Sequence, residues 1–326
     1  MPKDAHIGRN PHRTPPDVSV IVLNWNDREV IADCLASVFE HGPEDLQMIV
    51  IDQGSTDGSR KLIQERFPQA QMEALGENRG FAGGRNEGVL HAYGRYVLFL
   101  DADARLQPDT LARFKRFLDS HPDVGLVGPK LVFPDGRFQS VGGYSFSLWR
   151  QLVYWTGLGA ALKHRYPRLC QYLEVDIAQP TAVDWVAGAC QFWRRRVWGD
   201  AGPIDEALYY MDDNEWCYRV RKSGWRIYSL PEAQVVHHLG GSGGLWTPLV
   251  VKGARSLPRF FRKHYGATAE VLYYALALTG LATRIAVFRA AAALTRAPGW
   301  RAKAVWSQRQ LLALCGIVSR LPRPTP

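Results

Sequence analysis

The stretch Tyr96–Arg105, YVLFLDADAR, constrains the fold of this chain more than any other stretch. Its first five residues are all apolar or aromatic, which predicts a strand that is buried on both faces. Asp101 and Asp103 follow at once, and two carboxylates at the exit of a buried strand repel each other unless a cation lies nearby. A divalent metal with a phosphate-bearing ligand would satisfy both. The alternative for so short a motif is an acidic turn that caps the next helix.

The residues before this stretch alternate apolar runs with segments of helical spacing. Val18–Leu23 and Met48–Ile51 have the length and the β-branched content of buried strands. Residues 28–41 carry apolar side chains at helical spacing, and a weaker strand is expected near Gln71–Leu75. Alternation of strands and helices at this short spacing predicts an α/β fold with a doubly wound parallel sheet.

Polar clusters follow three of the predicted strands, at Asn24–Asp27, Asp52–Asp57 and Asp101–Asp103. Ligands of such sheets bind outside the carboxyl ends of the strands, so these clusters should meet at one edge. Asp52 could accept a hydrogen bond there from the N–H of a pyrimidine ring. A turn or a helix cap is an equally open role for this residue.

A glycine-rich segment, ENRGFAGGRNEG, follows the third predicted strand. Gly80, Gly83 and Gly84 permit close approach of the backbone, and Arg79 and Arg85 could contact phosphates. The segment is not G-x-G-x-x-G, and the chain has no G-x-x-x-x-G-K-[ST] loop. These absences argue against a nicotinamide dinucleotide enzyme and a P-loop NTPase.

The segments IVIDQGSTDGS, ENRGFAGGRNEG and FLDADARL resemble the successive signatures of family 2 glycosyltransferases, over roughly Asp17–Gly266. Within that family the chain is most similar to bacterial rhamnosyl- and galactofuranosyltransferase-like members. The resemblance implies a GT-A fold and a nucleotide-sugar site. The residues expected to bind the nucleotide sugar are Asn24, Asn26, Asp52, Gly80, Arg85 and Asp101. Gln53 and Arg85 stand where the family usually or often has Asn, which leaves the identity of the base open.

Two segments of the second half resemble the family's base and acceptor motifs. MDDNEWC is similar to E-D-x-D-L-C, which implies that Asp213 is the catalytic base, with its neighbour Asp212 as the other candidate. WVAGAC resembles the small-residue motif near the acceptor site. Trp185, Gly188 and Glu215 are therefore expected on the acceptor side. The alternative for the acidic cluster is a favourable interaction of carboxylates with a helix N-terminus.

The segment HHLGGS resembles the family segment whose histidine completes the metal site. The resemblance therefore implies a metal held by Asp103, Asp101 and His237, with His238 as the fallback. A lone histidine in a loop is more often structural, although neutral imidazole is a common ligand of divalent metals. The expected cofactor is Mg²⁺ or Mn²⁺.

The net charge of +9 comes from the C-terminal end of the chain. From Lys252 onward there are 13 Lys or Arg and one acid, whereas the remainder has 27 basic and 30 acidic residues. The longest uncharged run there, Val271–Thr283, has 13 residues, and a bilayer-spanning helix needs about 20. We expect basic amphipathic helices on an anionic membrane surface, or alternatively helices packed on the catalytic domain. No nucleic-acid reading motif accompanies the charge, so no nucleic-acid partner is expected.

These observations predict four regions: a disordered lead over 1–16, a nucleotide-sugar-binding half over 17–130, an acceptor-binding half over 131–266 and a basic amphipathic helical tail over 267–326. The five cysteines form no C-x-x-C motif and the N-terminus has no apolar signal region, which favours a cytoplasmic protein, peripheral on the inner face of the cell membrane.

The resemblance implies an inverting, metal-dependent transfer of a sugar, rhamnose from dTDP-rhamnose, to a saccharide or polyprenyl-linked acceptor in cell-envelope polysaccharide synthesis. Two other classes are weighed against it. A sugar nucleotidyltransferase would carry a glycine-rich basic loop where this chain has NWNDRE. A non-catalytic carbohydrate-binding or scaffold protein would have no need of Asp103, Asp213 and His237 together.

Overall fold

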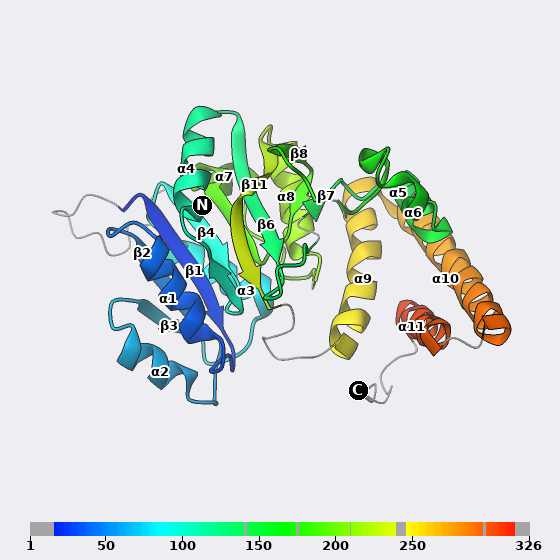
Figure 1. Cartoon of the computed structure of the whole chain (residues 1–326), viewed down its shortest axis with the longest axis horizontal. Coiled ribbons are helices and arrows are strands. Elements are labelled where there is room, and N and C mark those ends of the chain that lie inside the picture. Colours follow the sequence, from blue (N-terminus) through cyan, green and yellow to red (C-terminus); the bar gives the residue numbers. More distant parts are fainter. Residues whose placement is uncertain are drawn as a thin grey trace.

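The computed structural model describes residues 16–139, 142–173, 176–208, 210–238, 246–295 and 298–316, without the side chains of 246–255 and 298. Figure 1 shows an α/β domain with a group of helices beside it. The predicted lead over 1–16, apart from its last residue, lies outside the described residues, as does the Leu239–Ser242 part of the segment HHLGGS.

A nine-stranded sheet forms the centre of the α/β domain. Its strands, in spatial order, are β3 (Gln71–Ala74), β2 (Gln47–Asp52), β1 (Val18–Asn24), β4 (Tyr96–Leu100), β10 (Cys190–Arg194), β6 (Val124–Val132), β11 (Arg226–His237) and β5 (Ala104–Leu106), with β8 (Thr181–Val183) paired to β11. The first four strands are parallel, as predicted.

The second half of the sheet is mixed, which corrects the expectation of a parallel sheet throughout. β10 runs antiparallel to both β4 and β6, and β5 and β8 run antiparallel to β11. A short apolar run indicates a buried strand but carries no information about its direction. The direction of each strand in this half depends on the path of the loop that connects it to the preceding element.

Both faces of the sheet are covered, because alternate residues of β1 contribute to two separate cores. Val20 and Val22 pack in one core with α1 (Ile31–His41), α2 (Ser59–Arg66) and α4 (Thr110–Ser120). Ile21 and Leu23 pack in the other with α3 (Gly80–His91), α7 (Arg196–Ala201) and α8 (Asp212–Lys222). A strand buried on both faces explains the unbroken apolar runs in the sequence.

The residues after the sheet form helices that contact an insertion between β6 and β8 (Figure 1). The C-terminal helices are α9 (Trp246–Tyr265), α10 (Ala267–Thr295) and α11 (Pro298–Leu314). The insertion contains β7 (Gly142–Gly143), α5 (Leu148–Thr156), α6 (Gly159–Leu162) and a 3₁₀ turn at Pro167–Leu169, and β7 pairs with β9 (Trp185–Val186). Helix α10 packs on α5, α9 and α11.

The tail is helical as predicted, but its longest helix is apolar rather than basic and amphipathic. Helix α10 has 29 residues and a mean hydropathy of 1.6 over 18 of them, so by length and composition it could cross a membrane. The 13-residue uncharged run alone did not indicate this, because the helix continues past Arg284. That guanidinium lies 4.8 Å from the ring of Tyr154 and 5.1 Å from the ring of Trp155 on α5.

Helix α3 lies unusually close to β1 because it presents glycines to that strand. A Cβ atom on Gly88 would lie 2.4 Å from Cγ2 of Ile21, which is fully buried and stiff at its branched Cβ. We expect Gly88→Ala to lower the free energy of unfolding by about 1–3 kcal/mol through overpacking. Denaturant unfolding followed by circular dichroism measures this change.

The control is Gly199→Ala in α7, where an added Cβ would meet no atom within 4 Å. There alanine should raise helix stability by about 0.5–1 kcal/mol. Equal effects of the two substitutions would contradict the close approach of α3 to β1.

Candidate active site

The register of the parallel strands brings their polar ends to one edge of the sheet. Asn24 lies opposite Asp52, and Val22 lies opposite Leu100, the residue before Asp101. The antiparallel strand β10 adds a further segment, because the backbone N–H of Asp101 donates to the carbonyl of Ala189 at 3.0 Å. The predicted convergence of the polar clusters is therefore observed.

Asn24 and Asp52 fasten the loop that follows β2. Both side chains are fully buried, and Nδ2 of Asn24 donates to Oδ2 of Asp52 at 2.7 Å. The other oxygen of Asp52 accepts from the backbone N–H groups of Gly54 and Ser55, each at 3.2 Å. The carboxylate is enclosed and accepts hydrogen bonds from this chain, and nucleotide contact by Asn24 and Asp52 stays a prediction.

Asn26 and Gly80 shape the loops around this edge. Asn26 is exposed with φ of 59°, and its Oδ1 accepts from the backbone N–H of Thr56 at 2.8 Å. Gly80 begins α3 with φ of 73°, a left-handed conformation that glycine adopts without steric cost. Nucleotide contact by these two residues stays a prediction.

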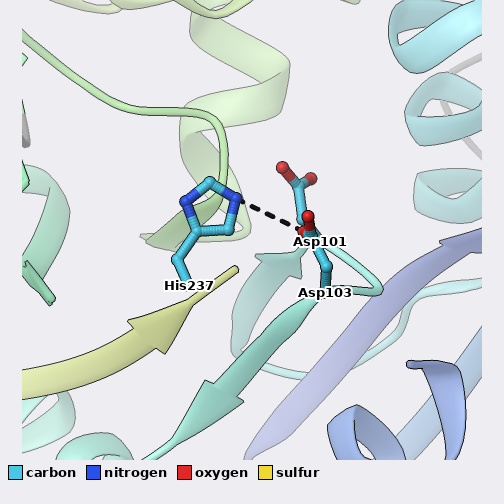
Figure 2. A group of neighbouring side chains, drawn as sticks. All are labelled: Asp101, Asp103 and His237. Carbon is cyan, nitrogen blue, oxygen red and sulfur yellow. Dashed lines mark ion pairs between the residues drawn. The ribbon is translucent and has the colours of Figure 1, made fainter. Parts of the chain in front are cut away.

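Asp101, Asp103 and His237 form one cluster, with ligand atoms that all lie within 4.8 Å of one another. Figure 2 shows the two carboxylates, which follow β4, facing the imidazole at the end of β11. Pairing of β11 with β5 sets this geometry, because it places His237 opposite Ala104. Nε2 of His237 lies 3.3 Å from Oδ1 of Asp103, whereas His238 is exposed.

Gln139 fixes the orientation of the imidazole, and nothing in the sequence indicated it. Its Oε1 lies 3.0 Å from Nδ1 of His237, and its Nε2 donates to the His237 carbonyl at 2.6 Å. Because an amide oxygen only accepts, Nδ1 must carry the proton, and in the neutral ring Nε2 keeps a free lone pair toward Asp103. Such outer partners orient metal-binding histidines. No local motif links two residues 98 positions apart.

The charges of this cluster suit a divalent cation. Burial raises the pKa of Asp101, and Asp103 raises it further against the opposing effect of Arg85. Burial lowers the pKa of His237, but its contact with Asp103 and the charge of Asp101 outweigh this and raise it. Two carboxylates and an imidazole that favour added positive charge are suitable ligands for Mg²⁺ or Mn²⁺. The donor set present therefore fits the expected metal.

Arg85 is buried within the site and joins the cluster to a second group of carboxylates. Its Nη2 donates to Oδ1 of Asp101 at 2.9 Å and to the carbonyl of Gly188 at 2.8 Å. Its Nη1 lies 3.9 Å from Oδ2 of Asp212. The guanidinium also lies over Phe99, 5.2 Å from the ring centre. This cation is thus committed to carboxylates of the chain itself.

The carboxylates of Asp212 and Asp213 stand at the first turn of α8. Oδ2 of Asp213 accepts from the backbone N–H of Gly188 at 2.8 Å, and Oδ1 accepts from that of Asn214 at 2.8 Å. Burial raises the pKa of both acids, to about 7 for Asp212, where the charge of Asp213 adds to the effect. A Cβ on Gly188 would lie 2.9 Å from Nη1 of Arg85, so a larger residue here would displace the guanidinium.

Two of the three predicted acceptor residues are buried and contact other residues of the protein. Glu215 is fully buried, and its carboxylate contacts Arg219, Lys263 and His264 at 2.8–3.0 Å. Trp185 is buried against aromatic rings, and its Nε1 donates to the Tyr144 carbonyl at 3.3 Å. Acceptor contact by these two residues stays a prediction, and Gly188 lies beside the carboxylate of Asp213.

Asp27 is a further buried acid that sequence reasoning left without a role. It belongs to the polar cluster after β1, and its Oδ2 accepts from the backbone N–H of Trp25 at 3.1 Å. Burial raises its pKa to about 7, and the charges of Asp103 and Asp101 add to the effect. The edge of the sheet is thus strongly acidic, with Arg85 as the cation buried within it.

Polar loops at the carboxyl edge of a parallel half-sheet, with a carboxylate–imidazole cluster and a second carboxylate pair, agree with the GT-A architecture that the sequence predicts. Residues 19–174 match the model for glycosyl transferase family 2. The chain therefore contains a domain of this family over these residues, and it is a glycosyltransferase.

Known proteins similar to this chain agree with that assignment. It is 25% identical over 242 residues to an N-acetylglucosaminyl-diphospho-decaprenol L-rhamnosyltransferase of Mycobacterium tuberculosis, covering 69% of this chain and 77% of that protein. It is 38% identical over 128 residues to a putative teichuronic acid biosynthesis glycosyltransferase of Bacillus subtilis, covering 37% of this chain and 50% of that protein.

A solved structure shows the same fold. The mannosyltransferase of Pyrobaculum calidifontis, in complex with GDP-Man and Mn²⁺, superposes with a TM-score of 0.59 at 20% identity. The match covers 93% of this chain and 87% of that one. The GT-A fold expected from the sequence is therefore confirmed.

The enclosure of Glu215 predicts a pH-dependent contribution to stability. Burial raises its pKa, but hydrogen bonds from His264, Arg219 and Lys263 outweigh burial and lower the pKa from 4.5 to about 2. The ionised form is favoured in the folded state, so its stabilisation is present above pH 4.5 and is lost as the pH falls toward 2. Glu215→Gln should cost on the order of 3 kcal/mol at pH 7.

Denaturant unfolding of wild type and Glu215→Gln across this pH range measures the effect. The difference in the free energy of unfolding between wild type and Glu215→Gln should become smaller as the pH falls. Glu65→Gln, at an exposed position, should change stability by less than about 0.5 kcal/mol. A gap for Glu215→Gln that does not vary with pH would show that the carboxylate charge is not its source.

Proposed function

We propose that this glycosyltransferase moves a sugar from a nucleoside diphosphate to an acceptor hydroxyl, with inversion and with the help of a divalent metal. One observation supports this most directly. Arg85 and Gly188 connect the Asp101–Asp103–His237 cluster to the Asp212–Asp213 pair within a single buried site. A leaving-group site and a base are thus side by side, as a single displacement requires.

Asp101, Asp103 and His237 would hold the metal, which supplies positive charge for the diphosphate leaving group. Gln139 keeps the imidazole turned so that its Nε2 faces the two carboxylates. Arg85 stabilises the ionised forms of Asp101 and of the acids on α8 by its own charge. The metal identity, Mg²⁺ or Mn²⁺, is left open, although the structural relative contains Mn²⁺.

Asp213 is the proposed general base, which removes the proton of the acceptor hydroxyl as this hydroxyl attacks the anomeric carbon. The backbone N–H of Gly188 holds its carboxylate in place. Its raised pKa makes the carboxylate a stronger base than a free aspartate. Asp212 is the second candidate, since its pKa is about 7 and its Oδ2 accepts no hydrogen bond within the described part of the chain.

For the donor and acceptor we propose rhamnose from dTDP-rhamnose and a saccharide or polyprenyl-linked acceptor. The mycobacterial relative, by its name, transfers rhamnose to a decaprenol-linked N-acetylglucosamine, and the Bacillus relative belongs to teichuronic acid synthesis. Both point to cell-envelope polysaccharide synthesis. The corresponding location is the cytoplasmic side of the cell membrane, with the protein peripheral on an anionic surface.

A panel of nucleoside diphosphate sugars tests the proposed function. Hydrolysis of each donor is measured with Mn²⁺, with Mg²⁺ and with a chelator, and then with saccharide and polyprenyl-diphosphate acceptors added. We expect metal-dependent turnover that is fastest with dTDP-rhamnose. Turnover of another donor would replace the sugar assignment, and turnover that a chelator does not reduce would overturn the metal proposal.

The two candidate bases can be separated by conservative substitutions. Asp213→Asn should slow transfer about 10²–10⁴-fold, because the base is lost, while nucleotide-sugar affinity stays near wild type. Asp212→Asn, one residue away, is the matched control and should slow transfer less. Single-turnover rates and donor affinity by calorimetry give both readouts. The opposite order of the two rates would assign the base to Asp212.

The metal site can be tested by binding as well as by activity. Asp103→Ala should abolish metal-dependent nucleotide affinity, and Gln139→Leu should weaken Mn²⁺ binding about 10–100-fold because the imidazole loses its partner. Titration followed by electron paramagnetic resonance measures free Mn²⁺. Gln107→Leu is the control, because Gln107 follows β5 whereas Asp103 precedes it. This variant should bind Mn²⁺ as wild type does. If Asp103→Ala bound Mn²⁺ and nucleotide with the affinity of wild type, the cluster would be rejected as the metal site.

A further inference from the structure

Helix α10 leaves one long face without a partner in the described part of the chain. Exposed, uncharged residues recur on it every three or four positions, at Leu272, Ala275, Thr279, Ala282, Ala286 and Ala290. With 3.6 residues per turn they form one continuous stripe. The opposite face is packed, since Tyr273, Ala277 and Leu281 are buried.

Large apolar side chains lie at both ends of this stripe and along its edge. Val271 is 65% exposed, Val287 54% and Leu294 86%. Isolated exposed apolar residues are ordinary on a soluble protein. A run of them along one helix face forms an extended patch, which marks an interaction surface.

The insertion packed on α10 exposes large apolar residues of its own. Trp149 is 56% exposed, Leu158 52% and Tyr166 53%. Helix α5 and α10 form one unit, because Gly280 allows Trp155 to approach and Arg284 lies over the ring of Tyr154.

Exposed basic residues lie among the apolar side chains of the insertion. Arg165 and Arg168 flank Tyr166, and both are exposed. No Asp or Glu occurs between Leu148 and Tyr172. Aromatic tips combined with cations are the composition that suits the interface of an anionic bilayer, where rings enter the headgroup region and cations contact phosphates.

We infer that the exposed face of α10 and residues 149–169 form a docking surface for an anionic phospholipid bilayer, in which α10 lies in the interface. This inference rests on the proposed membrane-linked acceptor and names the surface that meets the lipid. An interfacial position fits better than a crossing, because one side of α10 packs on α5, α9 and α11 and only the other side is free for lipid.

The docking surface is connected to the catalytic helix through α9. Lys263 and His264 contact Glu215 on α8, at 2.8 and 3.0 Å, and Tyr265 donates to the carbonyl of Phe146 in the insertion at 3.2 Å. The first turn of α8 carries Asp213. A bilayer bound to this surface would therefore hold the base at a fixed position relative to the lipid headgroups, as a polyprenyl-linked acceptor requires.

Sedimentation of the full chain with vesicles tests the inference. The probes are phosphatidylcholine vesicles with and without 30 mole per cent phosphatidylglycerol (a chosen composition, roughly that of an anionic membrane), at low and high salt. We expect binding to the anionic vesicles and partial release by salt. The double variant Leu272→Asp, Val287→Asp should lower the partition coefficient on the order of tenfold or more, because two charges enter the apolar stripe.

The matched control is Leu90→Asp on α3, where the original side chain is 62% exposed on another part of the protein. It should bind vesicles as wild type. Equal binding by wild type and the double variant, or no binding by wild type, would overturn the inference. A third outcome would also overturn it: wild type forms a dimer in gel filtration, the double variant is a monomer, and neither protein binds vesicles. A second copy of the chain would then cover the face.

Metal-dependent binding of a soluble nucleotide sugar separates this inference from the proposed function. The double variant should keep that binding and the unfolding temperature of wild type while losing vesicle binding. Failure of wild type itself to bind any nucleotide sugar would reject the proposed function, whatever its behaviour with vesicles.

Discussion

The buried guanidinium of Arg85 is the interaction on which the geometry of the site depends. It lies among Asp101, Asp212 and Asp213, whose negative charges would otherwise repel one another in a region shielded from water. Breaking a buried ion pair commonly costs on the order of 3–5 kcal/mol, because the remaining charge is left without compensation. The same guanidinium holds the Gly188 carbonyl, and the Gly188 N–H holds Asp213. One cation thus sets the spacing between the candidate metal cluster and the candidate base.

Sheet pairing gives this cation its partners. Antiparallel β10 places the Ala189 carbonyl on the N–H of Asp101, which brings the neighbouring Gly188 to the end of β4. Antiparallel β5 pairs with the end of β11 and brings His237 to Asp103. The parallel half of the sheet supplies the edge, and the antiparallel strands supply the residues that complete the site.

Helix α8 carries the candidate bases and also connects the sheet domain to the C-terminal helices. Its first turn carries the candidate bases, and in the same turn, two residues after Asp213, the buried carboxylate of Glu215 contacts cations of α9. The C-terminal helices are therefore fixed to the catalytic domain by a charge cluster as well as by apolar packing. This arrangement makes the position of the base dependent on the helices that we propose to contact the membrane.

Much of the fold and of the candidate metal site was determined by the sequence itself. Apolar runs of four to six residues indicated the buried strands β1, β2 and β4, since a strand covered on both faces has this pattern. The acids after β4 and the histidine at the end of the last long strand indicated the cluster of Asp101, Asp103 and His237. These features are local in sequence, or they follow from the rule that parallel strands share an edge.

Other features were decided only by the tertiary structure. Strand direction in the second half, the pairing of Gln139 with His237 and the commitment of Arg85 to Asp101 each join residues far apart in the chain. The sequence shows Glu215 and Trp185 within motifs, but only packing reveals that α9 encloses the first and aromatic rings enclose the second. The burial of a side chain and the residues that it contacts depend on which surfaces meet in three dimensions. The pattern of residues along the chain does not specify those contacts.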